Sequence, residues 1–155
     1  QANPEKAAAM AVHLARVKVD PETGEVKIVG FLAVQDVGKA INPAEGEAQI
    51  HGGVVQGLGI GLYEGLVYDD GGQLLTGTFM DYALPKAAQA PNIEIRLLED
   101  PSPHGPFGAR GVAESPIIGP AAAIANAIHD ATGVRLTELP MTSERIWKAM
   151  REAKA

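Results

Sequence analysis

The chain has 155 residues, and its 13 Lys and Arg against 19 Asp and Glu give a net charge of −6. It contains no cysteine, which excludes thiol nucleophiles, cysteine-bound zinc, cysteine-held iron–sulfur clusters and disulfides. The acidic balance and the lack of a Lys/Arg run argue against a nucleic acid partner. No apolar stretch reaches the roughly 20 residues of a membrane span, and no leader is visible, so we expect a cytoplasmic protein unless a partner carries an export signal.

The chain opens with a predicted hairpin. Residues 13–20 and 26–29 carry β-branched and apolar residues on either side of the turn Pro21-Glu22-Thr23-Gly24, and the second strand continues into residues 31–38. Asn42-Pro43 then precedes a predicted helix over residues 44–66. These elements suggest two antiparallel strands followed by a helix.

The predicted helix contains six glycines from Gly52 to Gly65. Each glycine costs a helix about 1 kcal/mol relative to alanine, so we expect something to approach this backbone closely, either a neighbouring element or a ligand. At 100° per residue, the predicted helix has two distinct faces. One face carries Gln49, Gly52, Gly53 and Gln56, and the other carries Ile50, Val54, Val55, Leu58 and Leu62. The second face is the candidate core face.

The middle of the chain is less regular. Residues 66–68 and 73–79 flank Asp69-Asp70-Gly71-Gly72, which predicts a second hairpin or a loop with short strands. Residues 92–98 alternate as a strand, and residues 101–110 form a loop rich in proline and glycine.

Two further helices complete the pattern. One begins near Ser115 as its cap, with Pro116 in the first turn and Gly133 as its stop. A last helix over about residues 143–152 is expected to bury Ile146, Trp147 and Met150. The order of elements predicts an α+β fold over residues 1–155, a two-layer α/β domain with a mixed sheet and helices packed on one face.

Glu114 is the candidate for chemistry. It stands at the predicted helix start, after the small residues of Gly108-Ala109-Arg110-Gly111-Val112-Ala113. Small residues allow a bulky ligand to come close, and the amide groups of a helix start favour anions. These features suit a general base, but a glutamate placed only to stabilise the helix dipole explains the local sequence equally well.

Several ordered motifs together resemble the C-terminal part of the molybdopterin-binding subunit of the xanthine dehydrogenase, aldehyde oxidase and carbon monoxide dehydrogenase family. The resemblance spans residues 12–147 and rests on five stretches: Val19-Asp20-Pro21-Glu22-Thr23-Gly24-Glu25-Val26, Asp36-Val37-Gly38-Lys39-Ala40-Ile41-Asn42-Pro43, Gln49-Ile50-His51-Gly52-Gly53-Val54-Val55-Gln56-Gly57-Leu58-Gly59, Asp81-Tyr82-Ala83-Leu84-Pro85 and Gly108-Ala109-Arg110-Gly111-Val112-Ala113-Glu114-Ser115-Pro116.

The resemblance assigns roles to five residues. It implies that Glu114 is the base beside the molybdenum, that Gln49 contacts the molybdopterin, and that the backbone of Arg110, Gly111 and Val112 runs along this cofactor. No side chain is implied as a metal ligand. The reaction that it implies is hydroxylation of an aldehyde or an N-heterocycle, with water as the source of oxygen.

The resemblance also implies partners. Family members bind the cofactor between two halves of a longer subunit, so we expect this chain to need an N-terminal half, together with an iron–sulfur subunit. Iron–sulfur centres and flavin are expected only on other chains. The alternative is a non-catalytic assembly domain that retains the fold.

Overall fold

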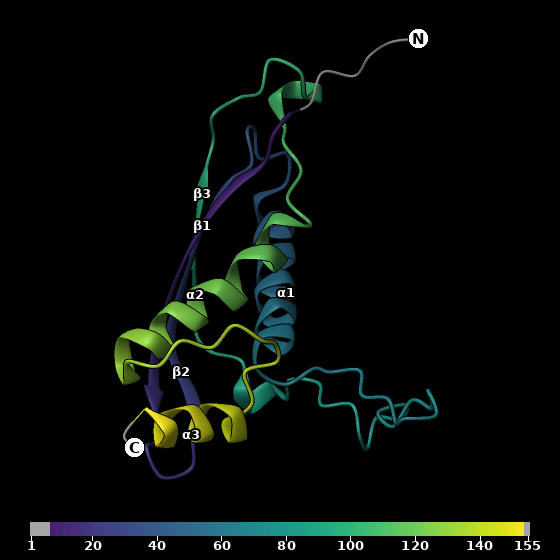
Figure 1. Cartoon of the computed structure of the whole chain (residues 1–155). Helices are drawn as coiled ribbons and strands as arrows, with labels where there is room; N and C mark the ends of the chain where they lie inside the picture. Colours follow the sequence, from purple (N-terminus) through teal and green to yellow (C-terminus); the bar gives the residue numbers. More distant parts are fainter. Residues whose placement is uncertain (1–6, 154–155) are drawn as a thin grey trace.

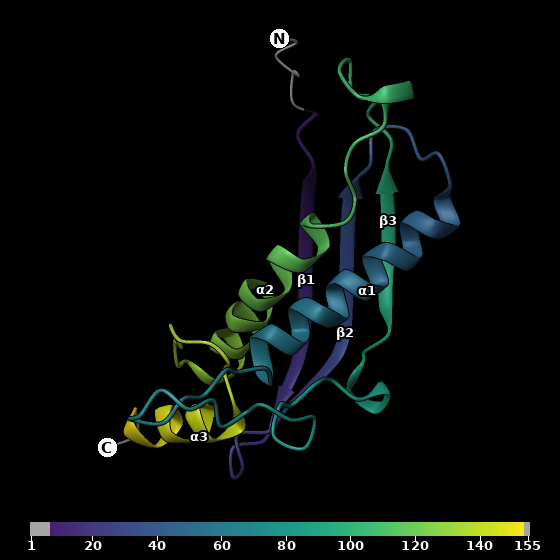
Figure 2. The same cartoon turned by 90° about the vertical axis from the view of Figure 1, so that its right-hand side faces the viewer.

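The computed structural model describes residues 7–153. Its elements follow in the order β1 (Met10–Val19), β2 (Val26–Asp36), α1 (Pro43–Leu62), η1 (Ala87–Gln89), β3 (Ile93–Leu98), η2 (Pro106–Gly108), α2 (Ser115–Thr132) and α3 (Ser143–Glu152). The α+β class predicted from the element order is confirmed, and Figures 1 and 2 show the helices α1 and α2 side by side on one face of the sheet.

The sheet is mixed and has the order β1-β2-β3. β1 and β2 form the predicted antiparallel hairpin, whereas β3 runs parallel to β2. The turn between β1 and β2 is closed by the Asp20 carboxylate, which accepts hydrogen bonds from the amides of Glu22 (2.8 Å) and Thr23 (3.2 Å). Gly24 has a φ of +73° and lies against α3, where an added Cβ would meet the Ser143 carbonyl oxygen. Glycine is therefore required at this turn.

The core lies between the sheet and the two long helices. Alternation along β1 and β2 directs one side of the hairpin toward the helices, as a period of two residues dictates. The cluster of buried apolar residues comprises Phe31, Ala33, Ile50, Val54, Leu58, Leu62, Ile93, Ile124, Ile128, Val134, Met141, Ile146 and Met150. The predicted core face of α1 is thus confirmed at Ile50, Val54, Leu58 and Leu62.

Helices α1 and α2 pack in parallel, with glycine at the contact. A Cβ added at Gly53 would lie 2.7 Å from Pro116 Cβ, and one added at Gly57 would lie 2.6 Å from the Ile117 carbonyl oxygen. One turn later, a Cβ at Gly61 would approach Ala121 to 3.3 Å. These three glycines, which we call the glycine stripe, face a neighbouring helix and not a ligand.

Helix ends follow local chemistry in most places. The Asn42 side chain accepts a hydrogen bond from the Glu45 amide (3.3 Å) at the start of α1, and Gly133 ends α2 in the left-handed conformation. The prediction that Trp147 is buried is wrong. It is only half-buried on α3, and the Arg151 guanidinium lies 5.2 Å from its ring centroid.

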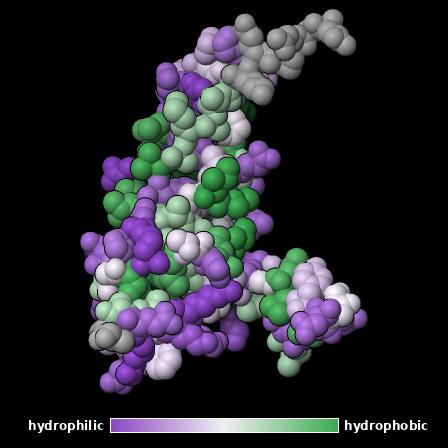
Figure 3. Space-filling model, viewed as in Figure 1, coloured by the Kyte–Doolittle hydropathy of each residue, from purple (hydrophilic) through white to green (hydrophobic). Residues whose placement is uncertain are grey.

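Residues 63–86 form an arm that projects from the body at the end of α1 (Figures 1 and 3). The only strand pairing of this arm is an isolated bridge between Tyr68 and Leu74, so the prediction of a loop with short strands is closer than that of a full hairpin. Phe79 and Met80 are 88% and 93% exposed. Within residues 7–153, no helix combines the length and the apolar character needed to cross a bilayer.

Candidate functional site

The outward side of α1 presents amide side chains and open backbone. Gln49, Gly52 and Gln56 are exposed, and a Cβ added at Gly52 would meet nothing within 4 Å. Gly53, which we expected on the same face, is buried against Pro116. The difference arises because α2 covers one border of the predicted face, leaving a narrower strip of Gln49, Gly52 and Gln56 accessible.

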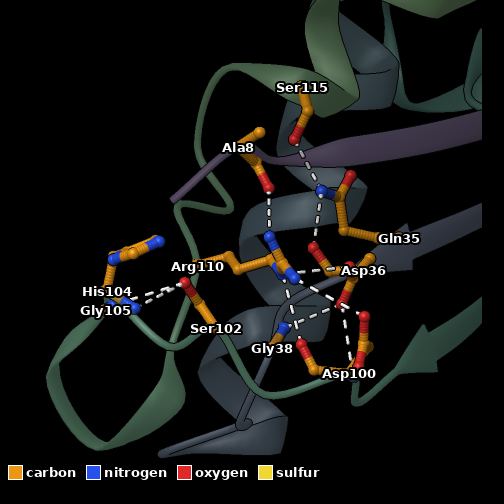
Figure 4. Close-up of polar contacts among 10 residues, drawn as sticks. All are labelled: Ala8, Gln35, Asp36, Gly38, Asp100, Ser102, His104, Gly105, Arg110 and Ser115. Carbon is orange, nitrogen blue, oxygen red and sulfur yellow. Dashed lines mark hydrogen bonds and ion pairs between the residues drawn. The ribbon is translucent and has the colours of Figure 1, made fainter. Parts of the chain in front are cut away.

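The loop that leads to Glu114 is fastened to the end of β2 by the side chain of Arg110. Arg110 Nε lies 3.0 Å from Asp36 Oδ2, and both side chains are almost buried, at 11% and 8% exposure. The guanidinium also donates to the carbonyl oxygens of Ala8 (2.7 Å) and Asp100 (3.2 Å), while Asp36 accepts from the Gly38 amide (2.9 Å). Figure 4 shows this cluster. Sequence reasoning missed the side-chain role of Arg110.

Backbone bonds reinforce the same attachment. The Arg110 amide donates to the Val37 carbonyl (2.9 Å), and the Lys39 amide donates to the Gly108 carbonyl (3.0 Å). Nearby, the hydrogen bond from Lys39 Nζ to Glu99 (2.7 Å) lowers the pKa of Glu99. The loop is therefore held on both its backbone and its side chains, which limits the positions open to the residues that follow it.

Gly111 and Val112 continue from this anchored point. Gly111 is exposed, and a Cβ added there would meet nothing within 4 Å. Val112 is half-buried and packs against the core cluster. One residue thus exposes its backbone while the next fixes the loop to the body of the protein.

Glu114 is exposed and immediately precedes α2. The prediction that Ser115 caps this helix is wrong, because Glu114 occupies the cap position in helical conformation without a capping side-chain bond. The Ser115 hydroxyl instead accepts a 2.7 Å hydrogen bond from Nε2 of Gln35, a fully buried residue on β2 (Figure 4). The Oε1 atom of Gln35 has no hydrogen-bond partner in the described part of the chain.

Because α1 and α2 run parallel, the turn of α1 that carries Gln49 and the start of α2 lie toward the same end of the helix pair. Gly53 touches Pro116, Gln49 is one helical turn before Gly53, and Glu114 is two residues before Pro116. Gln49 and Glu114 are both exposed, and the backbone is open at Gly52 on α1 and at Gly111 in the loop before α2. Among residues 7–153, no group of three or more His, Cys, Asp or Glu side chains is placed to hold a metal ion.

Comparison with known proteins decides the family. The profile of the molybdopterin cofactor-binding domain matches residues 1–91. The nicotine 6-hydroxylase large subunit of Paenarthrobacter nicotinovorans is 45% identical over 140 residues, or 88% of this chain. The carbon monoxide dehydrogenase large chain of Hydrogenophaga pseudoflava is 42% identical over 144 residues, or 91% of this chain.

The chain belongs to the molybdopterin-binding subunits of the xanthine dehydrogenase, aldehyde oxidase and carbon monoxide dehydrogenase family. A crystal structure of quinoline 2-oxidoreductase from Pseudomonas putida 86 superposes with a TM-score of 0.86, at 43% identity over 90% of this chain. These family members are molybdenum-dependent oxidoreductases. The chain spans only 18% of the Hydrogenophaga subunit, 17% of the nicotine 6-hydroxylase subunit and 18% of the quinoline enzyme chain.

Proposed function

We propose that this chain is the C-terminal cofactor-binding and base-supplying portion of a molybdenum hydroxylase that oxidises an aldehyde or an N-heterocycle with water as the oxygen source. It works with the N-terminal half of the molybdenum subunit and with an iron–sulfur subunit. The observation that carries the proposal is the contact of Gly53 with Pro116, which brings the turn of α1 that carries Gln49 and the start of α2, where Glu114 is exposed, toward the same end of the helix pair. The family membership of the chain supports it.

The accessible residues fit a flat, polar cofactor such as molybdopterin. The backbone is unobstructed at Gly52 and Gly111, so an extended ring system can approach the main chain there. The Gln49 amide can both donate and accept hydrogen bonds, as pterin edges require. We assign the binding contacts to Gln49 and to the backbone of Arg110, Gly111 and Val112.

When bound, the molybdenum cofactor supplies a Lewis-acidic metal that accepts two electrons from the substrate. Glu114 takes up the proton that water must lose when its oxygen is transferred. In the proposed complex this carboxylate, which is exposed on this chain, faces the seam that the other half of the subunit closes. The Arg110–Asp36 ion pair and the Gln35–Ser115 hydrogen bond fix the backbone on either side of Glu114.

The first prediction concerns Glu114. In the chain co-produced with an N-terminal half and an iron–sulfur subunit, Glu114→Gln should lower kcat by about 100-fold or more, the usual loss when a general base is removed. Because the substitution keeps the shape of the side chain, molybdenum content should stay the same. Dye-coupled oxidation and metal analysis of the purified complex measure the two quantities.

The control is Glu47→Gln, an exposed glutamate on α1 outside the assigned contacts, which should leave kcat unchanged. Undiminished turnover of Glu114→Gln at full molybdenum content would remove Glu114 as the base. A complex that assembles but never contains molybdenum would instead favour a non-catalytic assembly domain.

A further inference from the structure

β2 extends beyond the start of β3, so part of its edge has no strand beside it. β3 pairs with β2 from Phe31, opposite Ile93, to Asp36, opposite Leu98. Residues Val26 to Gly30 of β2 precede this pairing, and Figure 2 shows β2 continuing past the beginning of β3. Among residues 7–153, β1 is the only strand that pairs with this half of β2.

The ladder between β1 and β2 shows where the backbone groups of this segment point. The Asp20 amide donates to the Glu25 carbonyl (2.9 Å), so these two residues stand as a pair at a hydrogen-bonded position of the ladder, although the Glu25 amide turns to Thr23 Oγ1 (3.2 Å). Such pairs alternate with pairs that exchange no bond, so Val26 and Ile28 direct their amide and carbonyl groups away from β1. Across the register shift near Val29, the Phe31 amide points to the same side, where it bonds the Asn92 carbonyl (3.3 Å).

A cavity of about 1030 Å³ runs along this open edge. Leu62 and Met141 contribute apolar surface on the core side, while Lys27, Gln89 and Asn92 contribute polar groups. The segment before β3 therefore curves away from β2 and leaves room for another chain beside it.

The projecting arm begins and ends at the same cavity. Tyr63 and Ala83 line it, and the Tyr82 hydroxyl donates to Glu64 (2.6 Å), which joins the two ends of the arm to each other. Farther along the arm, Phe79 and Met80 have almost their full surface in solvent. Exposed apolar side chains of this size are typical of a surface that another polypeptide covers.

We propose that an extended segment of the remainder of the molybdenum subunit binds this cavity and adds a strand to the edge of β2 at Val26 and Ile28. The proposal rests on the function proposed above, in which this chain works with that remainder. A strand edge that remains uncovered promotes aggregation. A partner that adds a strand to such an edge is held through hydrogen bonds to its backbone. In the relatives, more than four fifths of the subunit lies outside the matched part and is available to supply such a segment.

Hydrogen exchange tests the proposal residue by residue. The probe is the unmatched part of the nicotine 6-hydroxylase large subunit, co-produced with this chain. The amides of Val26 and Ile28 should exchange rapidly in the chain alone and at least about 100-fold more slowly in the complex, because strand pairing protects amides from opening. The amides of Val17 and Val19 point to the other edge of β1 and should exchange at the same rate in both samples.

Proline variants test the same hydrogen bonds through affinity. Val26→Pro removes only an amide that points into the cavity and should weaken binding about tenfold, the effect of one lost hydrogen bond. Val19→Pro is the matched control, because Val19 lies opposite Val26 in the ladder and its amide points to the outer edge of β1. Urea unfolding of both variants establishes that each remains folded.

The outcomes separate the two proposals. Protection at Val26 and Ile28 together with selective weakening by Val26→Pro supports strand addition. A complex that forms and contains molybdenum, but leaves both amides unprotected, overturns strand addition and leaves the proposed function standing. Protection that appears in the chain alone at high concentration assigns the edge to a second copy and also overturns it, whereas failure of the two polypeptides to co-purify counts against the proposed function itself.

Discussion

Arg110 shows how one side chain can serve a site without facing it. The resemblance to the family implied a role for its backbone, and the structure adds a guanidinium that joins Asp36, Ala8 and Asp100. Asp36 and Arg110 are 74 positions apart in the sequence, and no local pattern links them. These contacts of the Arg110 side chain, which we call the Arg110 clasp, fix the end of the loop and therefore the position of the Glu114 backbone.

Removing the Arg110 clasp should lower the free energy of unfolding far more than removing an exposed ion pair. We expect Arg110→Met to lower the free energy of unfolding by about 3 kcal/mol, because it leaves the almost buried Asp36 carboxylate without its counter-ion. Arg96→Met breaks the solvent-exposed pair with Glu94 and should cost less than about 1 kcal/mol. Urea denaturation measures both, and equal losses would contradict the role assigned to the clasp.

At the scale of elements, the glycines of α1 have different structural roles. The stripe of Gly53, Gly57 and Gly61 admits α2, whereas Gly52 lies on the open side of α1. Gly57→Ala should lower the free energy of unfolding by about 1 to 3 kcal/mol, since its methyl group would overlap the Ile117 carbonyl and Pro120. Gly52→Ala should raise it by about 0.5 to 1 kcal/mol through helix propensity.

Thermal and urea unfolding of the two variants provide the comparison. A destabilised Gly52→Ala, or a Gly57→Ala as stable as the original chain, would show that the helix contact has been misassigned. The assembled enzyme offers a second measurement, since the Gly52 methyl group is expected to reduce molybdenum content while leaving the fold intact. The same glycine-to-alanine change thus separates packing from binding.

Local patterns predicted the elements well, and distant contacts explain what they missed. Alternation and helical spacing located the hairpin, β3 and the three α-helices, because apolar periodicity reflects which side is buried. They could not place α2 against Gly53, because periodicity gives the direction of a face but not its neighbour. Ser115 looked like a cap by sequence, yet its hydroxyl is engaged by Gln35 from another element.

At the scale of the whole molecule, one half-buried histidine, His13, links stability to pH. His13 lies on the side of β1 that faces the helices, with its ring 5.6 Å from that of Phe31 and its Nδ1 against Gly119. Burial lowers the pKa of His13 below its ordinary value of 6.5. The folded state therefore binds a proton less readily than the unfolded chain, and its stability is complete above pH 6.5 and falls as the pH drops through the lower, folded pKa.

The lowered pKa of His13 predicts that the free energy of unfolding decreases as the pH falls from 7.5 to 5. The decrease should begin near the ordinary His13 pKa of 6.5. His13→Leu should flatten this decrease, while His51→Gln, at an exposed position on α1, should leave it unchanged. Urea denaturation at a series of pH values measures the slopes. A His13→Leu curve parallel to that of the original chain would assign the pH dependence to other groups.

The contact between α1 and α2 also sets how far apart the two helices stand. Gly53 lies against the Pro116 ring, and Gly57 lies against the Ile117 carbonyl oxygen and the Pro120 ring, so the spacing of α1 and α2 depends mainly on rigid groups and not on side chains that can change rotamer. Substitutions elsewhere in the subunit that leave these contacts intact therefore also leave the spacing of the two helices unchanged. Under the proposed function, a change of substrate preference can thus arise without altering how the proposed base Glu114 stands relative to Gln49.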